Sequence, residues 1–200
     1  MKLYTAKYSQ TVGGTTGYAG FRNRRRLQLL TSLIPITPQS RVLEIGPNNC
    51  LLLDAFKVKA KTVLGIDINE DAVKKTDRPD LVCMDAAAMT FASSQFDAVI
   101  GIEVFEHITN LQQVFGEIRG VVVQGGKCYM TVPFELFRGM QALGDAWQVY
   151  GNLAMCRQLH VHKLNPRKIQ KMIAPTGLRL VASRLIWIPG PSYFIVLQKI

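Results

Sequence analysis

Short apolar runs and helical spacings alternate along the chain. Near-continuous apolar runs are typical of parallel strands covered on both faces, and we predict strands at 42–45, 61–67, 81–85, 96–102 and 127–132. Apolar residues at a helical spacing, with their capping residues, predict helices at 18–34, 51–56, 69–75, 110–120 and 165–174. Two further strands, at 180–188 and 193–198, flank Pro189-Gly190-Pro191, which indicates a hairpin. The pattern predicts a doubly wound α/β fold, a mostly parallel seven-stranded sheet that ends in a C-terminal antiparallel hairpin.

The 200 residues fit one domain, which can bury a full core without disulfides or metals. We expect a single domain over 1–200, with an N-terminal leader and helix at 1–40. A helical insertion at 134–157 is apolar for its length, which suits a lid that selects substrate and equally suits a core helix.

Charge is distributed unevenly along the chain. The net charge is +10, yet every Asp and Glu lies between Glu44 and Asp145, so basic ends flank an acidic middle. Basic ends suit an anionic macromolecule, a phosphorylated substrate or an anionic membrane surface, and also a solvated surface without a partner. We find no apolar run of about 18 residues that could span a membrane, although peripheral association stays open. The start shows no apolar signal-peptide core, so we expect a cytoplasmic protein.

Cysteine and histidine spacing gives little support for a metal centre. The four cysteines form no CxxC pair, so we expect reduced, mostly buried thiols. His160 and His162 would share one face of an extended segment, but no third ligand is evident beside them, and we predict no metal.

The strand at 42–45 runs through Gly46 into the next helix, as in a nucleotide cradle. Counted from Gly46, the second and third glycines of the dinucleotide-binding motif GxGxxG are replaced by Asn48 and Leu51. This disfavours NAD as the ligand. An acid ending strand two, Asp67, suits a ribose diol. Asp85 and the small Ala86, after strand three, suit an adenine amino group, and a carboxylate within strand one suits an ammonium group. Ribose, adenine and ammonium without phosphate describe S-adenosylmethionine.

Six segments, in order, resemble the class I S-adenosylmethionine-dependent methyltransferases of the small-molecule type; they are VLEIGPNNC (42–50), VLGIDIN (63–69), VCMDAAAMTF (82–91), FDAVIGIEVFEHI (96–108), VQGGKCYMTVP (123–133) and LHVHKLNPRKIQKMIAPTGLRL (159–180). The resemblance implies S-adenosylmethionine as cofactor, held by Glu44 and Gly46 at the methionine end, Asp67 at the ribose, Ile68, Asp85 and Ala86 at the adenine, and Glu103 behind the sulfonium. It also implies that the leader, with Tyr8 and Tyr18, folds over the cofactor.

The turn departs from the family's glycine-rich pattern. Asn48 tolerates a left-handed conformation and is expected to keep the turn. Cys50 adds a side chain that the family usually lacks there, which predicts a weaker hold on the cofactor.

Two histidines are candidates for acceptor chemistry. His107 lies where strand four meets the next helix, and His160 follows the insertion; each suits a proton-transfer role or a structural one.

We therefore expect methyl transfer to a small-molecule, lipid-like or glycan acceptor. The alternative is a methyltransferase-like fold whose basic ends bind RNA or an acidic partner, including RNA methylation. Nucleic acid is not favoured, because no NPPY motif follows strand four.

Overall fold

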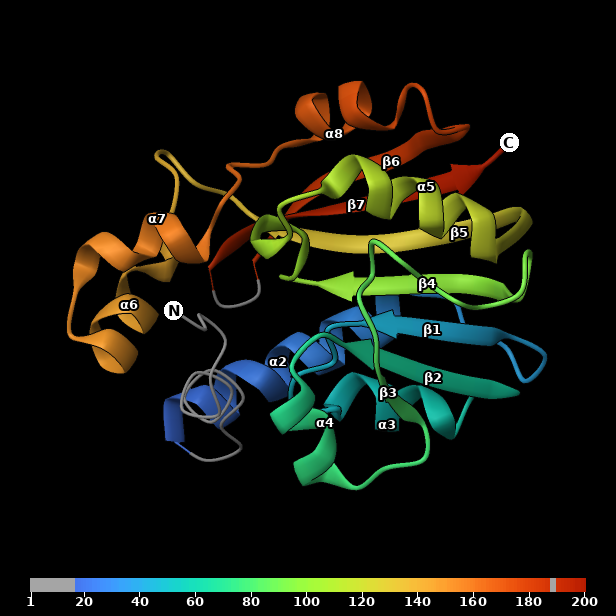
Figure 1. The fold of residues 1–200 in the computed structure, drawn as a ribbon, viewed down its shortest axis with the longest axis horizontal. Helices are drawn as coiled ribbons and strands as arrows, with labels where there is room; N and C mark the ends of the chain where they lie inside the picture. Colours follow the sequence, from blue (N-terminus) through green and yellow to red (C-terminus); the bar gives the residue numbers. More distant parts are fainter. Residues whose placement is uncertain (1–16, 188–189) are drawn as a thin grey trace.

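A mixed sheet organises the molecule, as the computed structural model of residues 17–187 and 190–200 shows (Figure 1). Within these residues the seven strands follow the order β3-β2-β1-β4-β5-β7-β6. Their bounds are β1 Arg41–Ile45, β2 Thr62–Asp67, β3 Leu81–Cys83, β4 Phe96–Ile102, β5 Val122–Pro133, β6 Leu178–Trp187 and β7 Pro191–Lys199. Strands β1 to β5 pair in parallel, whereas β7 lies antiparallel to both β5 and β6. The predicted doubly wound sheet with a C-terminal hairpin is confirmed.

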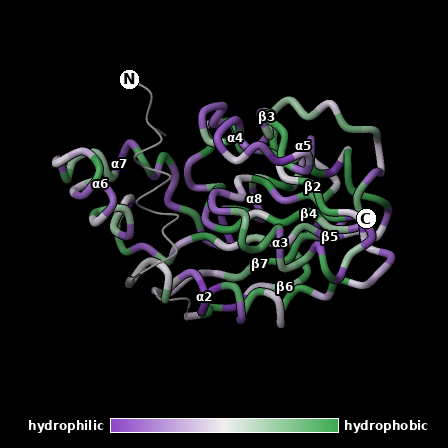
Figure 2. Tube along the Cα trace, turned by 90° about the horizontal axis from the view of Figure 1, so that it is seen from below, coloured by the Kyte–Doolittle hydropathy of each residue, from purple (hydrophilic) through white to green (hydrophobic). Residues whose placement is uncertain are grey.

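Helices cover both faces of the sheet. Alternate residues of β1 point to opposite faces: Leu43 and Ile45 pack with α5 (Leu111–Val121) and α8 (Pro166–Ile173). Val42 packs on the other side with α2 (Gly17–Leu33) and α3 (Leu51–Lys57). Helix α4 (Glu70–Thr76) follows β2. Figure 2 shows the mainly hydrophobic strands passing through the middle of the molecule, while α4 is mainly hydrophilic.

Local capping signals set two of the helix starts. The Asn69 side chain accepts from the amide of Ala72 at the start of α4, and Asn165 accepts from Lys168 at the start of α8, where Pro166 takes the first helical position. These N-caps confirm the predicted starts.

Among the strand boundaries that differ from the prediction, those of β3 and β5 change the place of a predicted feature. Strand β3 stops at Cys83, so Asp85 lies in the turn beyond the strand. Strand β5 begins already at Val122, directly after α5, and its pairing with β4 shifts between Phe96 and Ala98. The glycines at 125 and 126 therefore lie in a bulge within the strand, where an extra stretch of chain is accommodated.

The predicted insertion at 134–157 is helical over a different range. Residues 134–139 form no helix; the helical part comprises 3-10 turns at Met140–Ala142 and Leu153–Met155 and the helices α6 (Leu143–Tyr150) and α7 (Cys156–Leu159). This part has a small apolar cluster of its own, formed by Ala142, Ala146, Met155, Cys156 and Leu159. Two of its large apolar side chains, Trp147 and Leu153, stay exposed. This part lies beside the sheet and packs on its own cluster (Figure 1).

Cys50, Cys128 and Cys156 are buried and Cys83 is exposed, each as a free thiol, which confirms the cysteine prediction. No helix among the described residues has both the length and the apolar character needed to cross a bilayer. The leader with Tyr8, and the side chain of Tyr18, lie outside the described part of the chain.

Candidate functional site

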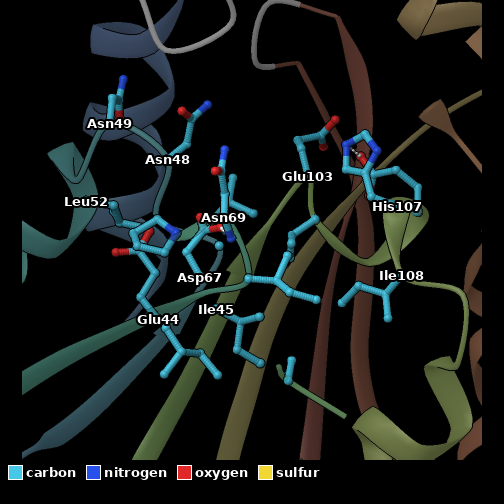
Figure 3. A pocket seen from close by; sticks show the side chains of 18 of the residues that line it. Glu44, Ile45, Asn48, Asn49, Leu52, Asp67, Asn69, Glu103, His107 and Ile108 are labelled. Atoms are coloured by element: carbon cyan, nitrogen blue, oxygen red, sulfur yellow. Dashed lines mark hydrogen bonds and ion pairs between the residues drawn. The ribbon is translucent and has the colours of Figure 1, made fainter. Parts of the chain in front are cut away.

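A cavity of about 540 Å³ opens at the carboxyl ends of the parallel strands (Figure 3). This is the edge where doubly wound sheets bind ligands, and the volume suits a small molecule. The cavity is lined by every candidate site residue of the sequence, namely Glu44, Gly46, Asn48, Asp67, Ile68, Asp85, Ala86, Glu103, His107 and His160.

The turn after β1 keeps the shape of a glycine-rich loop with few glycines. Gly46 has φ +65°, and a Cβ there would come within 2.6 Å of the Val104 side chain, so a larger residue does not fit. Asn48 (φ 45°) and Cys50 (φ 57°) also adopt the left-handed conformation. The Cys50 side chain is buried in the core with α3 and does not line the cavity. The anticipated intrusion of Cys50 is therefore not seen.

Glu44 is a buried acid in β1, two residues before Gly46. Its side chain is 5% exposed, and Oε2 has no hydrogen-bond partner among the described residues. Burial, aided by the charge of Asp54 and opposed by Arg78, raises the pKa of Glu44 to about 8. A cation bound beside Glu44 would favour its ionised form.

Two aspartates are oriented by their own turns. Asp67 Oδ1 accepts from the amide of Asn69 at 2.8 Å, and Asp85 Oδ1 accepts from the amide of Ala87 at 2.8 Å. Such turns hold a carboxyl group beside the end of its strand. Burial raises the pKa of Asp67, although the amides of Asn69 and Ile68 oppose the shift.

Glu103 holds a strained position between the two ends of the cavity. Its φ is 53°, an uncommon value for a non-glycine residue, and its amide donates to the Thr131 carbonyl and hydroxyl, both at 3.2 Å. The Glu103 Oε1 atom is buried without a hydrogen-bond partner within the described ranges. Strain of this kind concentrates at functional sites.

The far end of the cavity holds a histidine cluster. His107 Nδ1 lies 2.7 Å from the Leu159 carbonyl, and His160 Nδ1 lies 2.8 Å from Glu135 Oε1. The two rings meet edge to face, with centroids 5.0 Å apart. Burial lowers the pKa of His107 to about 4, and the charge of His160 adds to the effect. His107 is thus neutral at physiological pH.

His162 is placed elsewhere. Residues 160–165 form no strand, so His160 and His162 do not share a strand face. His162 Nε2 lies 3.2 Å from the Thr109 carbonyl, and the residue does not line the cavity.

The sequence analysis missed Glu106, Glu135 and the contribution of α2. Glu106 and the α2 residue Arg26 line the cavity, while Glu135 forms a hydrogen bond with His160 Nδ1. A signal for Glu135 existed, because it follows β5 within an apolar stretch much as Asp67 ends β2. No sequence signal indicates that α2 contributes to the cavity, because its position depends on packing with α3.

The donors at the Gly46 end fit S-adenosylmethionine. Glu44 provides a buried carboxylate with an unpartnered oxygen for an ammonium group. Asp67, at the end of β2, lines the cavity with a carboxylate that suits a ribose diol. Ile68, 64% exposed, and buried Ala86 offer an apolar surface to a base.

Comparisons with known proteins identify similar sequences and folds. A family model described as "Methyltransferase domain" matches residues 43–130. A ubiquinone biosynthesis O-methyltransferase of Coxiella burnetii is 22% identical over 149 residues, which cover 70% of this chain and 64% of that protein. A 24-methylenesterol C-methyltransferase 2 of Oryza sativa subsp. japonica is 29% identical over 122 residues, covering 54% of this chain and 34% of that protein.

The chain therefore spans about 64% of the length of the curated ubiquinone-pathway relative from Coxiella burnetii. Among solved structures, an S-adenosylmethionine-dependent methyltransferase from Mesorhizobium loti has a TM-score of 0.68 at 12% identity and covers 87% of this chain and 97% of that one. The family match over residues 43–130 and the shared fold lead to one description. Residues 43–130 match the methyltransferase domain family, and the chain has the fold of solved S-adenosylmethionine-dependent methyltransferases.

Proposed function

We propose that this protein transfers a methyl group from S-adenosylmethionine to a small, apolar, lipid-like acceptor. The observation that carries the proposal is one cavity that joins the strand-end acids Glu44 and Asp67 to the histidines His107 and His160. Cofactor and acceptor would thus lie in a single enclosure, as an in-line displacement requires.

At the cofactor end, the chain's own residues bind and orient. Asp67 would accept hydrogen bonds from the ribose hydroxyls, and Glu44 would balance the ammonium charge directly or through water. Asp85 and Ala86 would contact the adenine, against Ile68. The bound cofactor supplies an activated methyl group on a sulfonium.

At the acceptor end, the insertion would act as a lid. Gln141 and Asp145 line the cavity from this segment, and Leu136, Phe137 and Trp147 expose apolar surface nearby in sequence. The matched ubiquinone and sterol methyltransferases are named for apolar substrates, which supports an acceptor of this class.

The histidines would prepare an acceptor hydroxyl. Leu159 O can only accept a hydrogen bond, so His107 carries its proton on Nδ1 and its neutral ring presents a lone pair at Nε2. In its neutral form His160 has the same arrangement, with Nδ1 donating to the Glu135 carboxylate. Two Nε2 lone pairs at one end of the cavity suit the removal or displacement of a proton.

Calorimetry with S-adenosylhomocysteine tests the cofactor half of the proposal, and we expect saturable binding to one site. Absence of heat at millimolar ligand would refute it. The acceptor half is tested by methyl transfer from labelled cofactor into an apolar lipid extract and a polar extract in parallel. Label appearing in RNA, or tight salt-dependent RNA binding without binding of S-adenosylhomocysteine, would favour the alternative of a nucleic-acid-binding protein.

A further inference from the structure

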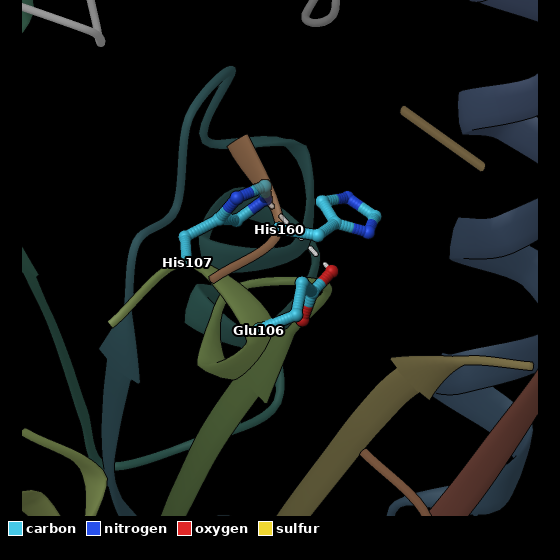
Figure 4. A group of neighbouring side chains, drawn as sticks. All are labelled: Glu106, His107 and His160. Atoms are coloured by element: carbon cyan, nitrogen blue, oxygen red, sulfur yellow. Dashed lines mark ion pairs between the residues drawn. The ribbon is translucent and has the colours of Figure 1, made fainter. Parts of the chain in front are cut away.

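We propose that Glu106, His107 and His160 bind a divalent transition-metal ion such as Zn²⁺ or Mn²⁺ at the acceptor end of the cavity. One ligand atom from each of these side chains lies within 4.8 Å of the other two. Figure 4 shows the three side chains, from two separate segments of the chain, lying next to one another.

The hydrogen bonds at Nδ1 of the two histidines are of the kind that metal-ligating histidines make. A ligating histidine nearly always donates its second ring N–H to a carbonyl or carboxylate, which fixes the tautomer and the ring orientation. His107 Nδ1 meets the Leu159 carbonyl at 2.7 Å, and His160 Nδ1 meets the Glu135 carboxylate at 2.8 Å. Both rings therefore present Nε2 as the ligating atom, and Glu135 acts as a positioning residue.

The carboxylate of the set is buried and lacks compensation. Glu106 is 1% exposed, and its Oε2 has no hydrogen-bond partner among the described residues. Its Oε1 lies 3.8 Å from His107 Nε2. Neighbouring Glu103 adds a second buried, unpartnered oxygen, Oε1. Buried acids are normally paired or bound to a metal, because an isolated buried charge is costly.

Burial and the charges of Glu103 and Glu135 raise the pKa of Glu106, and Arg26, which lines the same cavity, opposes this shift. An arginine does not account for two imidazoles that lie beside the same carboxylate, each within 4.8 Å of it and of the other. The ion we infer accounts for the carboxylate and both imidazoles together.

The ligand types select the ion. Two imidazole nitrogens and one carboxylate suit Zn²⁺, Mn²⁺, Fe²⁺ or Co²⁺, whereas Mg²⁺ and Ca²⁺ prefer oxygen ligands. Three protein ligands leave at least one position open, as catalytic sites do. In a role that rests on the proposed function, this position would receive an acceptor oxygen, whose pKa the ion would lower.

The experiment is a titration of the full-length protein with Co²⁺, a visible probe, followed by competition with Zn²⁺, Mn²⁺ and Mg²⁺. We expect one equivalent of Co²⁺ to bind, with absorption bands of a nitrogen- and oxygen-ligated ion, and Mg²⁺ to compete poorly. Wild-type protein that fails to bind Co²⁺, Zn²⁺ and Mn²⁺ at millimolar concentration would overturn the proposal. Binding with the charge-transfer absorption of a thiolate would also overturn it, because it would place the ion at a cysteine.

Two variants locate the site. Glu106→Gln keeps the shape of the side chain and should weaken Co²⁺ binding by at least about tenfold, since altered metal shells commonly cost 10–100-fold. His162→Gln is the matched control, because His162 lies beside the cluster in sequence but outside the cavity, and it should bind Co²⁺ as the wild type does. Equal affinity of Glu106→Gln and wild type would refute the ligand assignment.

Calorimetry of S-adenosylhomocysteine with the wild type separates this inference from the proposed function. Wild-type protein that binds the metal but not S-adenosylhomocysteine would contradict the proposed methyl transfer. Wild-type protein that binds S-adenosylhomocysteine but no metal would contradict the proposed metal site.

Discussion

His160 and Glu135 form a buried pair: Nδ1 of the imidazole lies 2.8 Å from Oε1 of the carboxylate, and the side chains are 7% and 1% exposed. Glu135 also accepts from the amides of Gly139 and Gln141, at 3.1 and 3.0 Å. Burial alone would raise the pKa of Glu135, but the bonds from His160 and the two amides outweigh it and lower the pKa. One carboxylate thus ties the start of the insertion to the residue that follows its last helix.

Replacing Glu135 by Gln should loosen this connection. A neutral amide is a weaker acceptor for three donors, and one oxygen position becomes an NH₂ group that faces donors. We expect unfolding free energy to fall by about 1–3 kcal/mol, the usual cost of an unsatisfied buried partner. Urea unfolding measures the effect. The control is Glu70→Gln, an exposed acid paired with Lys74 on α4, which should change stability by less than about 0.5 kcal/mol. Equal stability losses in the two variants would contradict the structural role of Glu135.

Asp67→Asn tests the ribose contact of the proposed function. The amide keeps an oxygen that can accept from the Asn69 amide, so the turn should survive. It loses a charged acceptor for the ribose, and we expect the affinity for S-adenosylhomocysteine to fall by about 1.5–3 kcal/mol. Isothermal calorimetry reports this directly. Asp71→Asn, on the exposed surface of α4, should leave the affinity unchanged, and an unaltered affinity in Asp67→Asn would exclude the ribose contact.

The left-handed turn makes a prediction at Asn48. This residue has φ 45°, a conformation that glycine adopts freely, asparagine tolerates and alanine resists. Asn48→Ala should therefore be less stable than Asn48→Gly by about 1–2 kcal/mol. Comparison of the two variants by thermal or urea unfolding cancels the loss of the asparagine side chain, since neither variant has it. An alanine variant as stable as the glycine variant would show that the turn relaxes.

Features encoded within a few residues were predicted correctly. The caps Asn69 and Asn165 act on amides three residues ahead, and Gly46 bends the chain at its own position. Asp67 and Asp85 reach the cavity because parallel strands end on one edge of the sheet, whatever the details of the packing.

Features that depend on distant partners were not predictable in the same way. Glu135 meets His160 across 25 residues, and this contact exists only because the insertion folds back on itself. The early start of β5 depends on its pairing with β4, which places Val122 beside Phe96. Periodicity along one segment carries no information about such a register.

Glu44 gives a pH-dependent prediction. Its pKa rises from an ordinary 4.5 to about 8 on folding, chiefly through burial. Between these values the folded protein binds a proton that the unfolded chain releases, so this group lowers stability as pH rises from 4.5 to about 8. Glu44→Gln removes the titration. The variant should gain at least about 1 kcal/mol over wild type on going from pH 4 to pH 8.

Urea unfolding of both proteins across this range isolates Glu44, because other titrating groups contribute equally to each. A pH-independent difference between variant and wild type would show that Glu44 does not hold its proton. Added S-adenosylhomocysteine should give the opposite trend in the wild type, because an ammonium group beside Glu44 favours its ionised form. Ligand stabilisation of the wild type should then increase with pH through about 8, and this increase should be absent in Glu44→Gln.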